Sequence, residues 1–305
     1  MAAEITPLRS RKRDASERDA AAIITASYAP DFERCKLLCE TIDRFVTGFT
    51  QHYILVEHRD APLFRQLESA RRRVVDEHDL LPSWLRSFPD PTSLFKRRIW
   101  LSSRTQPLRG WHVQQLRRMA IASHIPEETL VYCDSDVVFL KEYDCGSFRR
   151  GERLRLFRRD NALAQPIEYN HRVWSRNAAL AFGLPVEPPS LHDYITTLIA
   201  WDAGAARDML AHIERRHGKH WIEVIASTRQ FSECMLYGRY VDDVLSGAAH
   251  FHDHTELCRV YWFGPAPSDA GFHDFVAEMG DEQVAIGMQS FIGTDVARIR
   301  KLIAA

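Results

Sequence analysis

The chain has 305 residues, of which 45% are hydrophobic and 27% charged, enough to bury the core of one large domain or two closely fused lobes. A formal net charge of −1 excludes a global basic field that would attract nucleic acid. No apolar run reaches the length of a membrane span or a signal peptide, so we expect a cytoplasmic protein. Peripheral association with the inner face of a membrane stays open, and so does the oligomeric state.

The first part of the chain alternates between strand and helix patterns. Residues 1–19 are charged and poor in apolar side chains, which predicts a flexible tail. The apolar run AAAIITA then predicts a strand buried on both faces, and helical spacing follows behind Asp31. Strands are predicted at residues 20–26, 52–57 and 73–76, and helices at residues 32–46 and 62–67. This order is typical of a parallel sheet covered by helices.

Residues 79–107 interrupt the alternation. They are rich in proline, serine and basic residues and too long for a simple connection, so we interpret them as a lid or an active-site loop. Helical periodicity returns at residues 111–123, and LVYC predicts a fourth strand that ends directly at Asp134-Ser135-Asp136. A further apolar run at residues 137–140 predicts another strand.

The second half has a looser order. We expect strands at residues 154–157 and 194–200, and helices at residues 203–216, 231–240 and 283–303. The fold class that follows is α/β, with a mixed, mainly parallel central sheet flanked by helices. Residues 20–305 are expected to form a single domain, in which residues 20–145 bind a nucleotide and residues 146–305 complete the sheet and bind the second substrate. The scattered cysteines, without a CxxC pair, favour buried thiols.

The acidic triplet Asp134-Ser135-Asp136 is the strongest chemical signal. Two carboxylates directly after an apolar strand would be costly if buried and unpaired. Residues i and i+2 of an extended segment point to the same side, so both aspartates can converge on one cation while Ser135 faces away. Carboxylate oxygens suit Mg²⁺ or Mn²⁺, which also coordinate substrate phosphates. The competing interpretation is a solvated turn between two strands.

The stretch GWHVQQLRRMAIASHIPEETLVYCDSDVVFL resembles the GT-A glycosyltransferase superfamily, in which a helix leads to a strand that bears a DxD motif. A broader similarity, through IITASYAPDFERC, HYILVEHRD, GWHVQQL and FSECMLYGRYV, is to an uncharacterised bacterial family of glycosyltransferase-like proteins linked to surface polysaccharide synthesis. The resemblance implies a GT-A fold, a nucleotide-sugar donor (UDP-sugar first) and a hydroxyl acceptor such as a glycan.

The resemblance also implies roles for particular residues. Residues after the first strand would hold the base and ribose, with help from Asp60, and residues at the start of the next long helix would contact the sugar or diphosphate. These expected ligand-binding residues are Thr25, Ser27, Tyr28, Asp60, Gly110, Trp111, Gln114, Gln115 and Ser135. Each also has an ordinary structural explanation: Ser27 could end a strand, Asp60 could start a helix, and Trp111 could be core.

A third metal ligand is expected from the HFHDH segment, where His252 or His254 could join Asp134 and Asp136. The alternative is an edge strand with its histidines in solvent. An inverting transferase also needs a general base, for which Glu233 is the first candidate, although a surface helix carboxylate would look the same. Asp193 could bind acceptor hydroxyls.

Two other classes of protein compete. A haloacid-dehalogenase-like phosphatase would use Asp134 as its nucleophile and Asp242-Asp243 as the later acidic pair. Three predicted strands precede Asp134, however, whereas the nucleophile of that fold ends the first strand. A binding protein that kept the fold and lost turnover is the non-enzymatic alternative.

Overall fold

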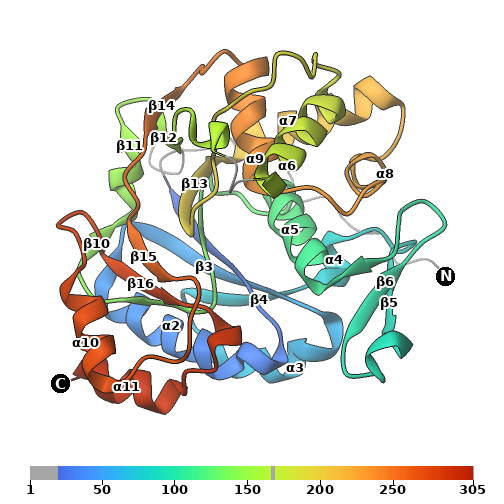
Figure 1. Ribbon diagram of the computed structural model, residues 1–305. Coiled ribbons are helices and arrows are strands. Elements are labelled where there is room, and N and C mark those ends of the chain that lie inside the picture. Colours follow the sequence, from blue (N-terminus) through green and yellow to red (C-terminus); the bar gives the residue numbers. More distant parts are fainter. Residues whose placement is uncertain (1–19, 166–168, 305) are drawn as a thin grey trace.

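A five-stranded sheet forms the centre of the computed structural model, which describes residues 20–165 and 169–304 (Figure 1). The predicted tail at residues 1–19 lies outside these ranges. Three parallel pairings join four of the strands, and β13 adds to one edge in the antiparallel direction. In spatial order the strands are β13 (Leu198–Asp202), β8 (Thr129–Cys133), β1 (Ala21–Ala26), β3 (Phe49–Val56) and β4 (Arg72–Asp76). The prediction of a mixed, mainly parallel sheet is confirmed.

Both faces of this sheet are covered, which explains the unbroken apolar run of β1. Ala22 and Ile24 pack in one hydrophobic cluster with helix α5 (Gly110–Ala120). Ala21 and Ile23 belong to another cluster, together with α2 (Phe32–Phe45). Successive side chains of a strand point to opposite faces, so α5 and α2 lie on opposite sides of the sheet.

The remaining helices extend these two layers. On the α5 side, the same cluster includes side chains of α6 (Tyr169–Phe182), α7 (Ala203–His217), α8 (Trp221–Ile225) and α9 (Glu233–Arg239). On the α2 side, α10 (Asp269–Ala277) and α11 (Val296–Ala304) pack against α2, as Figure 1 shows. Two short helices, α3 (Ala61–Phe64) and α4 (Glu77–Leu80), follow β3 and β4.

Four small sheets surround the central one. They are β9 (Val137–Phe139) with β16 (Ala285–Met288) and β15 (Cys258–Tyr261); β11 (Arg149–Arg150) with β12 (Arg153–Phe157) and β14 (His250–Asp253); β5 (Arg86–Pro89) with β6 (Arg98–Leu101) and β7 (Leu108–Arg109); and β10 (Tyr143–Asp144) with β2 (Val46–Thr47). The predicted loop at residues 79–107 therefore contains the end of α4 and a β5–β6 hairpin.

Two expectations about secondary structure need correction. The helix predicted at residues 283–303 is wrong in its first part, because the apolar run AIGM pairs as β16 between β15 and β9. The strand predicted at residues 194–200 starts only at Leu198. The helices α6 and α10 were not predicted. The six cysteines are all buried and unpaired, as expected. Within the described ranges, none of the helices combines the length and the apolar character needed to cross a bilayer.

Candidate functional site

The acidic triplet lies at the carboxyl end of β8, where the chain leaves the central sheet and enters β9 of a neighbouring sheet. The turn is closed by a hydrogen bond from the Val137 N–H to the Asp134 carbonyl at 3.2 Å. The Met288 N–H, from β16, donates to the Asp136 carbonyl at 3.0 Å. The pair is therefore anchored on both sides, at the sheet edge where α/β proteins bind their ligands.

The carboxylate of Asp136 is in an unfavourable environment. Burial, with the nearby charges of Asp134 and Asp31, raises its pKa to about 7, although Arg34 acts in the opposite direction. Its Oδ1 atom is buried without a hydrogen-bond partner. A buried carboxylate oxygen without a partner, beside a second carboxylate, is an arrangement that a hard divalent cation would stabilise. The residues present thus fit a magnesium or manganese ion, and Ser135 between them is buried.

Arg118 joins Asp134 to Glu233. This buried side chain of α5 places its Nη1 atom 3.0 Å from the Asp134 carboxylate and 3.2 Å from that of Glu233. Glu233 is the first residue of α9, and its N–H donates to the side-chain oxygen of Gln115 at 3.0 Å. Burial raises the pKa of Glu233, and the charge of Arg118 only partly opposes it. The structure therefore brings the expected base and the first aspartate of the pair to one arginine.

The two glutamines of α5 both form hydrogen bonds with backbone groups. Gln115 donates to the Trp111 carbonyl at 3.4 Å in addition to holding Glu233, and it is 3% exposed. Gln114 donates to the Ala26 carbonyl at the end of β1. Gln115 is thus a positioning residue for Glu233, and the expectation that it binds sugar directly is wrong. Gly110 and Trp111 remain on the surface, with Trp111 half exposed beside Trp174.

The residues expected to hold the nucleotide differ in burial and in hydrogen-bond partners. Thr25 is fully buried and its hydroxyl is bonded to His52, so its expected contact with a nucleotide is wrong. Ser27 is also buried. Asp60 accepts the N–H of Ala29 at 2.9 Å, so it fixes the loop after β1. Only Tyr28, which is 48% exposed, presents its side chain to a ligand.

Tyr28 lines a polar pocket of about 380 Å³ between the loop after β1, the start of α2 and residues 290–296. Asp31 and Arg34 also line this pocket, and both act electrostatically on Asp136. Arg34 donates to the carbonyls of Met288 and Thr294, which ties the C-terminal wall to α2. The pocket therefore adjoins the acidic pair, and Tyr28 and the 69% exposed Phe291 provide aromatic surfaces.

The expected histidine ligands lie elsewhere. His252 is on β14, in a sheet with β12, and its Nε2 atom is 2.7 Å from Asp242 and 3.1 Å from Arg158. His254 follows that strand. In the described part of the chain, no group of three metal-binding side chains joins either histidine to Asp134 or Asp136. The prediction of a third ligand from this segment is not supported. The pairing of β14 with β12 holds the segment in another sheet, and His252 is hydrogen-bonded to Asp242.

Asp193 is a buried anchor. It is 0% exposed, and one of its oxygens is 2.6 Å from Arg159 and 3.1 Å from His171. The other oxygen accepts the Ile195 N–H. Burial alone would raise its pKa, but the hydrogen bonds from His171 and Arg159 lower it overall. The expected contact with acceptor hydroxyls is therefore wrong, since protein groups satisfy both oxygens.

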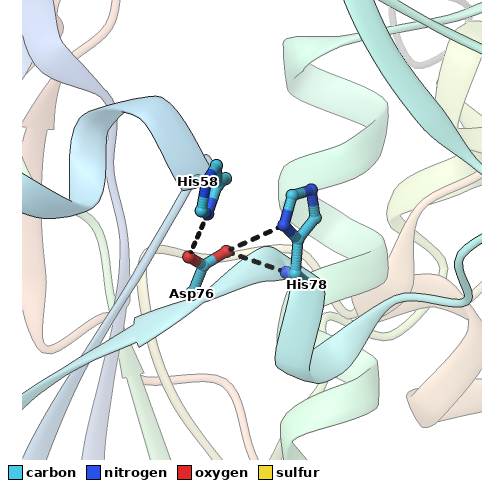
Figure 2. Close-up of side chains that lie close together, drawn as sticks. All are labelled: His58, Asp76 and His78. Carbon is cyan, nitrogen blue, oxygen red and sulfur yellow. Dashed lines mark hydrogen bonds and ion pairs between the residues drawn. The ribbon is translucent and has the colours of Figure 1, made fainter. Parts of the chain in front are cut away.

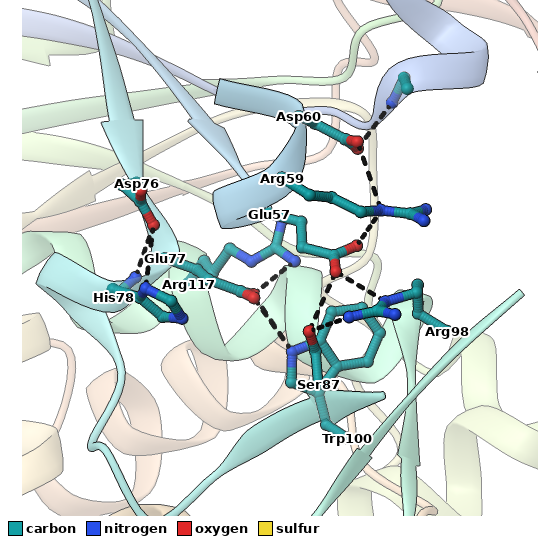
Figure 3. Close-up of polar contacts among 11 residues, drawn as sticks. Glu57, Arg59, Asp60, Asp76, Glu77, His78, Ser87, Arg98, Trp100 and Arg117 are labelled. Atoms are coloured by element: carbon teal, nitrogen blue, oxygen red, sulfur yellow. Dashed lines mark hydrogen bonds and ion pairs between the residues drawn. The ribbon is translucent and has the colours of Figure 1, made fainter. Parts of the chain in front are cut away.

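Sequence reasoning missed the polar groups that follow β3 and β4, shown in Figure 3. Glu57 binds Arg98 at 2.8 Å and Ser87 at 3.0 Å, and Glu77 binds Arg117 at 2.9 Å and the Trp100 indole. Both glutamates are buried, and their partners on β5 and β6 show that they anchor the hairpin to the sheet. Their place directly after two strands could have indicated them. A histidine pair around Asp76, also missed, lies at the same sheet edge.

Fold and site together define a class: a mixed α/β protein with an acidic pair and a buried glutamate at the carboxyl edge of a mainly parallel sheet. A family model described as "Family of unknown function (DUF6492)" matches residues 21–284. The chain belongs to this family. No curated protein matches the sequence.

Proposed function

We propose that this protein is a metal-dependent glycosyltransferase of the GT-A type, which moves a sugar from a nucleotide-diphosphate sugar to a hydroxyl acceptor. The observation that carries the proposal is the unpartnered oxygen of Asp136 beside Asp134, next to a pocket with aromatic walls. A nucleobase could stack on Tyr28 or Phe291 while the diphosphate reaches the acidic pair.

In this proposal, Asp134 and Asp136 hold Mn²⁺ or Mg²⁺. The cation would neutralise the charge of the diphosphate leaving group. Glu233 receives the proton of the acceptor hydroxyl, because its raised pKa brings a carboxylate closer to the neutral range in which a base is efficient. Arg118 keeps Glu233 ionised and in place, and Gln115 fixes the start of α9.

The phosphatase alternative has less support. It needs Asp242 and Asp243 near Asp134, but Asp242 is bound by Tyr194, Arg158 and His252. Asp243 forms an ion pair with Arg239. Both aspartates are thus occupied within the α9 and β14 region.

We propose the surface of an anionic membrane as the place of action. The β5–β6 hairpin carries Leu94 and Phe95 at its tip, exposed by 78% and 68%. Lys96 and Arg97 follow directly and are also exposed. Apolar side chains beside basic ones suit insertion at the boundary between headgroups and acyl chains.

The proposal is tested by thermal unfolding with a panel of UDP-, GDP- and dTDP-sugars, with and without Mn²⁺. A ligand that binds the folded protein raises its melting temperature, and the rise should require Mn²⁺. Asp134→Asn and Asp136→Asn should each remove the effect, whereas Asp281→Asn, at an exposed position, should keep it. Binding that is unchanged in both site variants would refute the proposal. Turnover of p-nitrophenyl phosphate would favour the phosphatase. Metal-dependent binding of a nucleotide sugar without transfer or hydrolysis would favour a binding protein.

A further inference from the structure

Two histidines and an aspartate meet at the carboxyl ends of β3 and β4 (Figure 2). The parallel register of these strands places Val56 opposite Asp76, so the residues two positions further along, His58 and His78, emerge side by side. Their rings stack with centroids 4.3 Å apart and an angle of 23° between planes. The strand register therefore fixes the pair.

Asp76 lies below the two stacked rings and is held in place (Figure 2). Its Oδ2 atom is 2.6 Å from Nδ1 of His58, and its Oδ1 atom accepts the backbone N–H of His78 at 2.9 Å. Nδ1 of His78 is 4.0 Å from the same Oδ1. The side chain of Asp76 is 16% exposed, whereas those of His58 and His78 are 63% and 66% exposed. A rigid carboxylate thus has two accessible imidazoles above it.

We propose that His58, Asp76 and His78 bind one borderline divalent cation, with Zn²⁺ as the preferred ion. In the described part of the chain, these residues alone bring three such ligand atoms within 4.8 Å of one another. Two neutral imidazoles and a carboxylate match the ligand preference of zinc. The ion would take the place of the hydrogen on Nδ1 of His58, and the neutral imidazole would carry its single proton on Nε2.

This centre is separate from the Asp134–Asp136 pair and does not depend on the proposed transferase activity. The acidic pair offers oxygen atoms and suits Mg²⁺ or Mn²⁺, whereas the histidine centre offers two nitrogens. Three protein ligands on an exposed edge leave at least one coordination position for water or an anion. A bound ion would also link the turn after β3 to the start of α4.

The test is calorimetric titration of the untagged, full-length protein with Zn²⁺. We expect one site, and His58→Ala and His78→Ala should each weaken zinc binding at least about 10-fold. Removing a residue that only supports a metal ligand already costs about 10-fold in affinity, and these residues would bind the metal themselves. His273→Ala is the matched control, because His273 is exposed on α10 away from the centre. Asp134→Asn combined with Asp136→Asn should leave this zinc affinity unchanged, which separates the two sites.

Circular dichroism checks that the variants fold, and Co²⁺ gives a second readout. A visible absorption band of bound Co²⁺ that disappears in the Asp76→Asn variant would support direct ligation. The proposal is overturned if folded His58→Ala and His78→Ala variants bind Zn²⁺ as tightly as the wild type. It is also overturned if the loss appears only in the Asp134 and Asp136 variants.

Discussion

Replacing Asp136 by asparagine should make the metal-free protein more stable above neutral pH. In the folded protein the pKa of Asp136 is raised from 3.8 to about 7, so the folded state keeps a proton that the unfolded chain has lost. Stability contributed by that proton is present at low pH and is lost as pH rises between about 4 and 7. Asparagine imitates the protonated acid at every pH.

The size of the effect follows from the pKa change. Each tenfold change in the acid constant corresponds to about 1.4 kcal/mol, so a pKa that moves from 3.8 to about 7 gives about 4 kcal/mol as an upper value. We expect Asp136→Asn to raise the free energy of unfolding by about 1–4 kcal/mol at about pH 8. The gain should shrink steadily as pH falls towards about 4.

Urea unfolding followed by circular dichroism, with a chelator present, measures this dependence. Asp281→Asn, an exposed aspartate, should show no comparable pH-dependent gain. Added Mn²⁺ should then stabilise only the wild type, with an affinity that rises with pH until Asp136 is fully ionised. A metal-free Asp136→Asn protein that is less stable than the wild type at about pH 8 would contradict an unfavourable, ionised Asp136 in the folded protein.

Three further predictions concern the site and the hairpin. Glu233→Gln should keep Mn²⁺-dependent nucleotide binding and lose sugar transfer by about 100-fold or more in a product-release assay; full activity would exclude it as the base. Arg118→Met should lower the free energy of unfolding by about 3–5 kcal/mol in urea, because two carboxylates lose a buried partner, and the combination with Glu233→Gln should recover part of the loss. Leu94→Ser with Phe95→Ser should abolish co-sedimentation with vesicles rich in phosphatidylglycerol, whereas Phe263→Ser, at an equally exposed position, should not; equal binding of both proteins would contradict membrane docking by the hairpin.

The sheet could be predicted from local patterns because its strands are short apolar runs. The run that forms β1 is buried on both faces, and the run that forms β8 ends directly at Asp134, so each strand and its end are visible in the sequence. The segment AIGM of β16 could not be distinguished from a helix by its apolar character alone. Its identity is decided by two distant partners, β9 and β15.

The sequence predicted where the acidic pair and Glu233 lie in the fold, and it predicted the surroundings of the other candidate residues less well. Both features carry a local signal: a strand end for Asp134, and an amphipathic helix start for Glu233. The fates of Thr25, Gln115 and Asp193 depend on partners 27, 118 and 34 positions away. Sequence spacing does not show whether a polar side chain is already satisfied by the protein, and these three are.

The position of β16 in the sequence decides when the pocket can form during synthesis on the ribosome. The acidic pair is synthesised long before β16, yet Met288 of β16 provides the backbone contact that steadies Asp136. A nascent chain that has only just exposed Asp134 and Asp136 lacks the last wall of its pocket. The protein can therefore acquire the binding properties of this pocket only after β16 and residues 290–296 have been synthesised.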